Sequence, residues 1–190
     1  MTRPYSLYPT IPTRCLFLDR DGTLIKECHY LRDPALVVLE NGVVEGLKIF
    51  QNLGYRLVVV SNQSGISRSL ISTSELEAVN LRIAELLATE RIIIASWHHC
   101  PHLPDQGCSC RKPATGLFLA ADSMHPVDWQ NSIMVGDKPS DIQAGLALGL
   151  FTALVTTGYG TRHVEWAQQS CIPVINSLLD LVTLVNGRHD

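Results

Sequence analysis

The sequence contains no apolar run near the length of about 18 residues that a membrane-spanning helix needs. It has no marked excess of either charge, since the formal net charge is −3, and this indicates no surface for nucleic acid. Residues 1–13 contain three prolines and no apolar core of the kind that a secretory signal carries. We therefore expect no membrane span, no nucleic-acid partner and no secretory signal.

A regular cysteine framework is also missing. Cys100, Cys108 and Cys110 lie close together among the six cysteines. The other three are scattered along the chain: Cys15, Cys28 and Cys171. Disulfide-stabilised secreted domains show more regular spacing, so we expect a reducing compartment and a cytoplasmic protein.

The length of 190 residues predicts a single domain, residues 1–190, large enough to bury about 70% of the surface of the unfolded chain. The apolar fraction of 46% and the charged fraction of 17% fit a globular protein. No internal repeat, low-complexity tract or linker is visible, and we expect a monomer.

Short apolar runs alternate with segments of helical periodicity. Strands are predicted at residues 15–18, 55–60, 92–97, 132–135 and 151–155, with a candidate sixth at 174–175. Helices are predicted at residues 42–53, 74–87, 116–123, 139–147 and 178–185, the second opened by a Ser74–Glu77 capping box. This alternation predicts an α/β fold with a doubly wound, Rossmann-like parallel sheet, whose ligands gather beyond the carboxyl ends of the strands.

The first predicted strand ends in two carboxylates, Asp19 and Asp21. Neighbouring carboxylates repel unless a cation joins them, and Mg²⁺ suits an all-oxygen site that also takes substrate phosphate. A calcium loop counted from Asp19 would need an acidic or amide residue, glycine and glutamate at its fifth, sixth and twelfth positions. Those positions hold Thr23, Leu24 and Tyr30. A plain turn after a strand is the alternative interpretation of these residues.

Three further polar motifs follow later strands or lie in the loops beyond them. They are Ser61-Asn62, Lys112 before Pro113, and Gly136-Asp137 with Asp141. In this order after Asp19-Arg20-Asp21-Gly22-Thr23, they resemble the haloacid dehalogenase (HAD) superfamily of phosphohydrolases, over about residues 15–157. The resemblance implies a HAD-like fold and Mg²⁺-dependent phosphomonoester hydrolysis through an aspartyl-phosphate.

The resemblance also implies a role for each carboxylate. Asp19 would attack phosphorus, and Asp21 would protonate the leaving alcohol and then activate water. Mg²⁺ would be held by Asp19, the backbone carbonyl of Asp21 and Asp137. Asp141 is either a carboxylate that supports the site or a solvated helix residue.

Polar and cationic groups would bind the phosphoryl oxygens. The Ser61 hydroxyl and the Asn62 backbone N–H would donate to them, and Lys112 would add positive charge. A receiver-type phospho-signalling domain is a distant alternative, but it needs an aspartate after the third strand. The sequence there reads Trp97-His98-His99-Cys100, which favours the phosphatase.

The loop of residues 98–112 contains soft metal ligands at short spacing. The set is Cys100, His102, Cys108 and Cys110. Three thiolates and one imidazole leave no open position, which is typical of structural Zn²⁺, and the ion would pin the loop directly ahead of Arg111. Ordinary thiols are the alternative, and His98 and His99 are competing ligands.

Within the superfamily, the zinc loop is similar to two subfamilies, the D-glycero-D-manno-heptose 1,7-bisphosphate phosphatases and the histidinol-phosphate phosphatases. The features that resemble the heptose enzymes are Ser61-Asn62-Gln63-Ser64-Gly65-Ile66 with Arg68, His29-Tyr30, and Gly136-Asp137-Lys138. The short spacer between His102 and Cys108 is closer to the histidinol enzymes. The favoured activity is therefore removal of the 7-phosphate of the heptose bisphosphate, with histidinol phosphate as the alternative substrate.

About forty residues separate the first two motifs, so no large cap domain fits and loops must select the substrate. The predicted substrate contacts are Glu27, Cys28, His29, Tyr30, Ser61, Asn62, Gln63, Ser64, Arg111 and Lys138. Arg111 and Lys138 are expected to hold a second, distal phosphate. The role of Cys28 is unexplained. Three other cations are either site contributors or plain surface charge: Arg20, Lys26 and Arg68.

Overall fold

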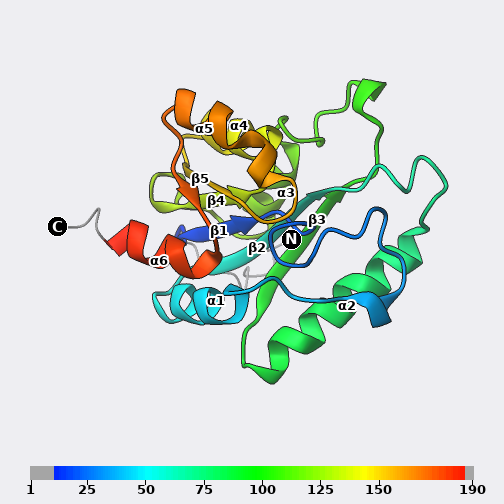
Figure 1. Cartoon of the computed structure of the whole chain (residues 1–190), viewed down its shortest axis with the longest axis horizontal. Coiled ribbons are helices and arrows are strands. Elements are labelled where there is room, and N and C mark those ends of the chain that lie inside the picture. The colour runs from blue at the N-terminus through cyan, green and yellow to red at the C-terminus, as the bar shows by residue number, and fades with distance from the viewer. Residues whose placement is uncertain (1–10, 187–190) are drawn as a thin grey trace, which may run out of the picture.

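The structure is a computed structural model that describes residues 11–186. A parallel sheet of six strands in the order β3-β2-β1-β4-β5-β6 forms its centre (Figure 1). The strands are β1 (Cys15–Leu18), β2 (Arg56–Asn62), β3 (Ile94–Cys100), β4 (Ile133–Gly136), β5 (Phe151–Val155) and β6 (Val174–Ile175). The predicted doubly wound α/β fold is confirmed. Receiver-like sheets have the order 2-1-3-4-5, so the signalling alternative is wrong.

Helices cover both faces of the sheet (Figure 1). One face carries α1 (Val43–Asn52), α2 (Thr73–Thr89) and α6 (Leu178–Asn186). The other carries α3 (Gly116–Met124), α4 (Pro139–Ala147) and α5 (Val164–Gln169). Side chains of β1 alternate between two cores, with Leu16 and Leu18 in the first and Cys15 and Phe17 in the second. Burial on both faces explains why this strand is uniformly apolar.

The segment between β1 and α1 contains a short 3₁₀ turn, η1 (Pro34–Leu36), and no inserted domain. The expectation that the chain lacks a large cap is confirmed for this part of it. Across residues 11–186, no helix is both long and apolar enough to cross a bilayer. The prediction that residues 1–13 hold no secretory signal concerns mostly residues 1–10, which lie outside the part of the chain that the structure describes.

The predicted Ser74–Glu77 capping box is wrong. Ser72 is the N-cap of α2: its hydroxyl oxygen accepts from the Glu75 N–H at 3.1 Å, and the Glu75 carboxylate accepts from the Ser72 N–H at 2.7 Å. Both serines have a glutamate three positions later, so the motif alone did not distinguish the two starts.

The third strand begins and ends later than predicted, at Ile94 and Cys100. It lies at the edge of the sheet, where its side chains are mostly half-buried and no apolar run marks its limits. His98 and His99 therefore lie within the strand and do not line the cavity described below. Helix α5 was not predicted because its six residues are too few to show helical periodicity.

Candidate active site

Residues beyond the carboxyl ends of the strands surround a cavity of about 310 Å³. It gathers most of the predicted site side chains. They are Asp19, Asp21, Glu27, His29, Tyr30, Ser61, Asn62, Gln63, Ser64, Arg111, Lys112 and Lys138. Cys28 is exposed and Asp137 is completely buried, and neither is among the side chains that line the cavity.

Asp19 and Lys112 form the buried centre of this site. The Lys112 Nζ donates to Asp19 Oδ1 at 2.8 Å and to the Val60 carbonyl at 2.6 Å. It also forms an ion pair with Asp141 Oδ1 at 2.6 Å. Burial acts to raise the pKa of Asp19, but the charges of Lys112 and Lys138 hold that pKa below its ordinary value. Asp19 is therefore an ionised carboxylate at neutral pH, as a nucleophile requires.

Asp141 is a buried member of the same network. Besides pairing with Lys112, its Oδ2 accepts the backbone N–H of Lys138 at 3.0 Å and so caps α4. A Cβ at Gly136 would collide with its carboxylate, which explains the glycine at the end of β4. Of the two interpretations of Asp141 in the sequence, the solvated helix residue is wrong.

Asp137 lies beside this network at the end of β4. Its Oδ2 accepts the Tyr159 N–H at 2.8 Å, and its Oδ1 lies 3.0 Å from the Lys138 Nζ. Burial and the neighbouring charge of Asp19 raise the pKa of Asp137 to about 7. Oxygens of Asp19, Asp137 and Asp141 lie within 4.8 Å of one another, which suits a divalent cation with oxygen ligands.

Side chains at the end of β2 connect the motifs. The Asn62 amide exchanges two hydrogen bonds of 3.0 Å with the backbone of Lys112. The Gln63 Nε2 donates to Ser61 Oγ at 2.7 Å and to Asp21 Oδ2 at 2.8 Å. These side-chain contacts of Asn62 were not predictable from the sequence, because the fold determines which residue fifty positions away an amide side chain meets.

The cations of the site differ in their surroundings. The Lys138 Nζ lies 3.8 Å from Glu27 and 4.0 Å from Asp19, so it faces the central carboxylates rather than the outer rim. Arg111 lines the cavity while its Nη1 donates to the His102 carbonyl at 3.1 Å. Lys26 and Arg68 are exposed and do not line the cavity. Arg20 is only 2% exposed, so the surface-charge interpretation is wrong for it.

Tyr159 lines the cavity from the loop after β5 and was missed in the sequence. Its ring has the Lys138 Nζ 5.0 Å and the Arg162 Cζ 4.8 Å from its centroid. The only signal for it was its place after a fifth predicted strand, whose carboxyl end shares the edge of the sheet with the other motifs.

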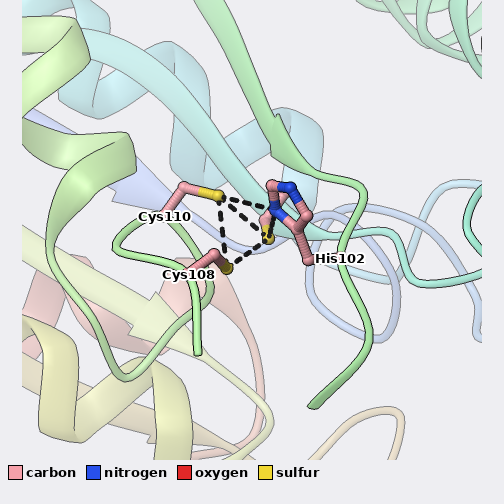
Figure 2. Close-up of side chains that lie close together, drawn as sticks. His102, Cys108 and Cys110 are labelled. Carbon is pink, nitrogen blue, oxygen red and sulfur yellow. Dashed lines mark hydrogen bonds between the residues drawn. The ribbon is translucent and has the colours of Figure 1, made fainter. Parts of the chain in front are cut away.

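The candidate zinc ligands converge at the end of β3, and Figure 2 shows His102, Cys108 and Cys110 turned toward one another. The Cys100 Sγ lies 3.4 Å from His102 Nδ1 and 3.1 Å from Cys110 Sγ, and the four ligand atoms lie within 4.8 Å of one another. Ligand atoms about 2.3 Å from a tetrahedral ion are separated by about 3.7 Å, so the cluster fits Zn²⁺.

The cluster also favours thiolate formation at one position. Partial burial acts to raise the pKa of Cys108, but hydrogen bonds from the Arg111 backbone and from Cys110 lower that pKa to about 6. Burial raises the pKa of Cys100 to about 12.

Comparison with known proteins gives the family. Residues 109–181 match the family model described as HAD-hydrolase-like. The Escherichia coli K12 protein named D-glycero-beta-D-manno-heptose-1,7-bisphosphate 7-phosphatase is 34% identical over 182 residues, 92% of this chain and 94% of that protein. This chain belongs to the HAD phosphatase family. It is therefore a phosphatase, as the four ordered motifs predicted.

Two other relatives of this HAD phosphatase extend the comparison. A Thermoplasma volcanium protein named probable D-glycero-D-manno-heptose-1,7-bisphosphate 7-phosphatase is 38% identical over 125 residues, 66% of this chain and 86% of that protein. The crystal structure of D,D-heptose 1,7-bisphosphate phosphatase from B. bronchiseptica has a TM-score of 0.84 and 26% identity. It covers 92% of this chain and 99% of that one, and it holds magnesium and phosphate.

Proposed function

We propose that this phosphatase removes the 7-phosphate of D-glycero-D-manno-heptose 1,7-bisphosphate in a Mg²⁺-dependent reaction. The observation that carries the proposal is the similarity over 92% of the chain to a protein named for that activity. The buried Asp19–Lys112–Asp141 network supports it, since it supplies a nucleophile with a fixed cation beside it. The proposal includes a single domain over residues 1–190. The monomeric state and the cytoplasmic location stay predictions.

In the proposed reaction, Asp19 attacks phosphorus. A bond forms between an Asp19 carboxylate oxygen and phosphorus, while the bond from phosphorus to the sugar oxygen breaks and that oxygen takes a proton from Asp21. Asp21 then takes a proton from the water that hydrolyses the aspartyl-phosphate. Ser61, the Asn62 N–H and Lys112 stabilise the charge on the transferring group by hydrogen bonds and positive charge fixed before the reaction.

The metals have separate roles in this proposal. Mg²⁺, held by Asp19, the Asp21 backbone carbonyl and Asp137, would offset the repulsion between the nucleophile and the phosphate. Zn²⁺, held by the cysteine and histidine cluster, would fix the loop that carries Arg111 and Lys112. The close oxygens of the carboxylates and the close sulfurs of the cluster support the two assignments.

The electrostatics of the cavity favour a bisphosphate over a histidinol substrate. A cationic amine would prefer a carboxylate on the cavity wall, and Glu27 is such a carboxylate. The Glu27 carboxylate lies 3.8 Å from the Lys138 ammonium, which offsets its charge. Because Lys138 also lies 3.0 Å from Asp137, we assign it to the phosphate that reacts and leave the distal phosphate to Arg111.

A phosphate-release screen tests the proposed substrate. We expect kcat/KM with Mg²⁺ to be highest for heptose 1,7-bisphosphate among that compound, fructose 1,6-bisphosphate and histidinol phosphate. Faster turnover of histidinol phosphate than of either bisphosphate would transfer the assignment to the alternative.

The Arg111→Ala variant tests the distal contact. A charge-assisted hydrogen bond contributes roughly 1.5–3 kcal/mol, so kcat/KM for the bisphosphate is expected to fall about ten- to a hundredfold. Turnover of p-nitrophenyl phosphate, which has no second phosphate, should change much less. Arg68→Ala is the control, because Arg68 is exposed and does not line the cavity. An equal loss on both substrates would assign Arg111 to the chemistry or the fold.

Metal analysis of the purified protein is expected to find about one zinc per chain. Cys108→Ser should lower both the zinc content and the melting temperature, since ligand loss removes free energy of metal binding that also stabilises the fold. Cys171→Ser is the matched control, because Cys171 is exposed and is not part of the cluster. A protein without zinc, with unchanged stability in Cys108→Ser, would contradict the assignment.

A further inference from the structure

Arg20 is a buried cation that the proposed reaction does not use. It stands between Asp19 and Asp21 in the sequence, and its side chain is 2% exposed. Its Nε and Nη2 donate to Asp21 Oδ2 at 3.1 and 2.9 Å, and its Nη2 donates to Asp21 Oδ1 at 3.0 Å. Both oxygens of the carboxylate assigned as the acid are thus held by one guanidinium.

The guanidinium is itself fixed from α2. The Arg20 Nη1, which does not contact Asp21, donates to the Asn80 Oδ1 at 3.0 Å. Asn80 is half-buried and does not line the cavity, so it has no direct access to a substrate there. Its amide oxygen satisfies a donor that would otherwise be buried unpaired, and it fixes the plane of the guanidinium.

A second group, Gln63, also donates to the Asp21 carboxylate. The Gln63 Nε2 donates to Asp21 Oδ2 at 2.8 Å, and the Gln63 backbone N–H donates to the Cys100 carbonyl of β3 at 2.7 Å. The Asp21 carboxylate therefore accepts hydrogen bonds from Arg20, which is fixed by α2, and from Gln63, which is fixed by the sheet. A side chain that is 17% exposed and accepts from two fixed donors has few orientations open to it.

We propose that Arg20, fixed by Asn80, is a positioning residue that holds Asp21 where it protonates the departing oxygen. The inference rests on the proposed function, because it requires phosphomonoester hydrolysis with Asp21 as the acid. Catalytic groups lose much of their effect when displaced by about 1 Å, so a loosened Asp21 is expected to transfer its proton poorly. The loss of rate in such variants should appear only with substrates whose leaving oxygen needs a proton.

Two phosphomonoesters of similar size separate this role from a structural one. p-Nitrophenolate leaves without a proton, whereas the alkoxide of benzyl phosphate requires one. The parameter kcat/KM reports steps up to formation of the aspartyl-phosphate, so the later hydrolysis, common to both substrates, does not enter it. We would measure it for Asn80→Ala and Arg20→Lys, with Arg82→Ala as the control, since Arg82 forms an exposed ion pair with Glu85 on the same helix.

General-acid catalysis contributes about 10²–10⁴-fold, so both test variants are expected to lose about ten- to a hundredfold on benzyl phosphate. They should lose less than about threefold on p-nitrophenyl phosphate, and the control should lose neither activity. Equal losses on both substrates, or an unchanged rate on benzyl phosphate in Asn80→Ala, would overturn the positioning role while leaving the proposed function intact. Hydrolysis of neither ester by the unmodified protein would overturn this inference, whereas failure of the proposed function would appear as no phosphate release from heptose 1,7-bisphosphate.

Discussion

Replacing Asp19 with asparagine is expected to lower kcat by about 10³–10⁶-fold, because the amide cannot serve as the nucleophile. The fold should survive, since asparagine is close to aspartate in shape and can still accept a hydrogen bond from Lys112 through its amide oxygen. The measurement is p-nitrophenyl phosphate turnover with Mg²⁺, together with the melting temperature of the variant.

The Asp105→Asn variant is a suitable control for this experiment. Asp105 is exposed in the zinc loop and does not line the cavity, so its replacement should leave turnover unchanged. Near-normal turnover in Asp19→Asn would remove the aspartyl-phosphate mechanism, whatever the substrate proves to be.

The Lys112→Met variant is expected to show the largest loss of stability. Lys112 is the buried counter-ion of both Asp19 and Asp141, and its ion pair with Asp141 is about 1% exposed on each side. Removing one partner of a buried ion pair typically lowers the free energy of unfolding by about 3–5 kcal/mol, because the other charge stays buried and unpaired. Urea denaturation of both proteins measures the difference.

A second substitution tests the cause of that loss. Adding Asp141→Asn to Lys112→Met removes one of the two stranded carboxylates, so the double variant is expected to be more stable than Lys112→Met alone. Lys48→Met is the control, since Lys48 pairs with Glu90 at the surface, where each side chain is 45% exposed, and a change within about 0.5 kcal/mol is expected. If Lys112→Met lowers the free energy of unfolding by less than about 1 kcal/mol, the explanation by a broken buried ion pair is wrong.

The central strands were predictable because a parallel sheet buries both faces of its inner strands. Such strands must be apolar without interruption, and β1 and β5 have the predicted bounds. The convergence of Asp19, Ser61 and Lys112 on one cavity also followed from the sequence, since parallel strands place their carboxyl ends on one edge.

The predictions that were wrong or missing concern features that the local sequence does not determine. Ser72 and Ser74 both fit a capping box by spacing, and in the fold Ser72 is the N-cap of α2. The edge strand β3 carries half-buried polar residues, so its end at Cys100 has no apolar signal. The contacts of Arg20 with Asn80 join side chains sixty positions apart, which no motif spacing reports.

The most direct test of the proposed function is which phosphate leaves. Heptose 1,7-bisphosphate would be incubated with the protein and Mg²⁺, and the products followed by ³¹P NMR. The account predicts that the signal of the 7-phosphate ester disappears as inorganic phosphate appears, while the anomeric 1-phosphate signal stays. Loss of the anomeric signal, or no release of phosphate from this compound at all, would contradict it.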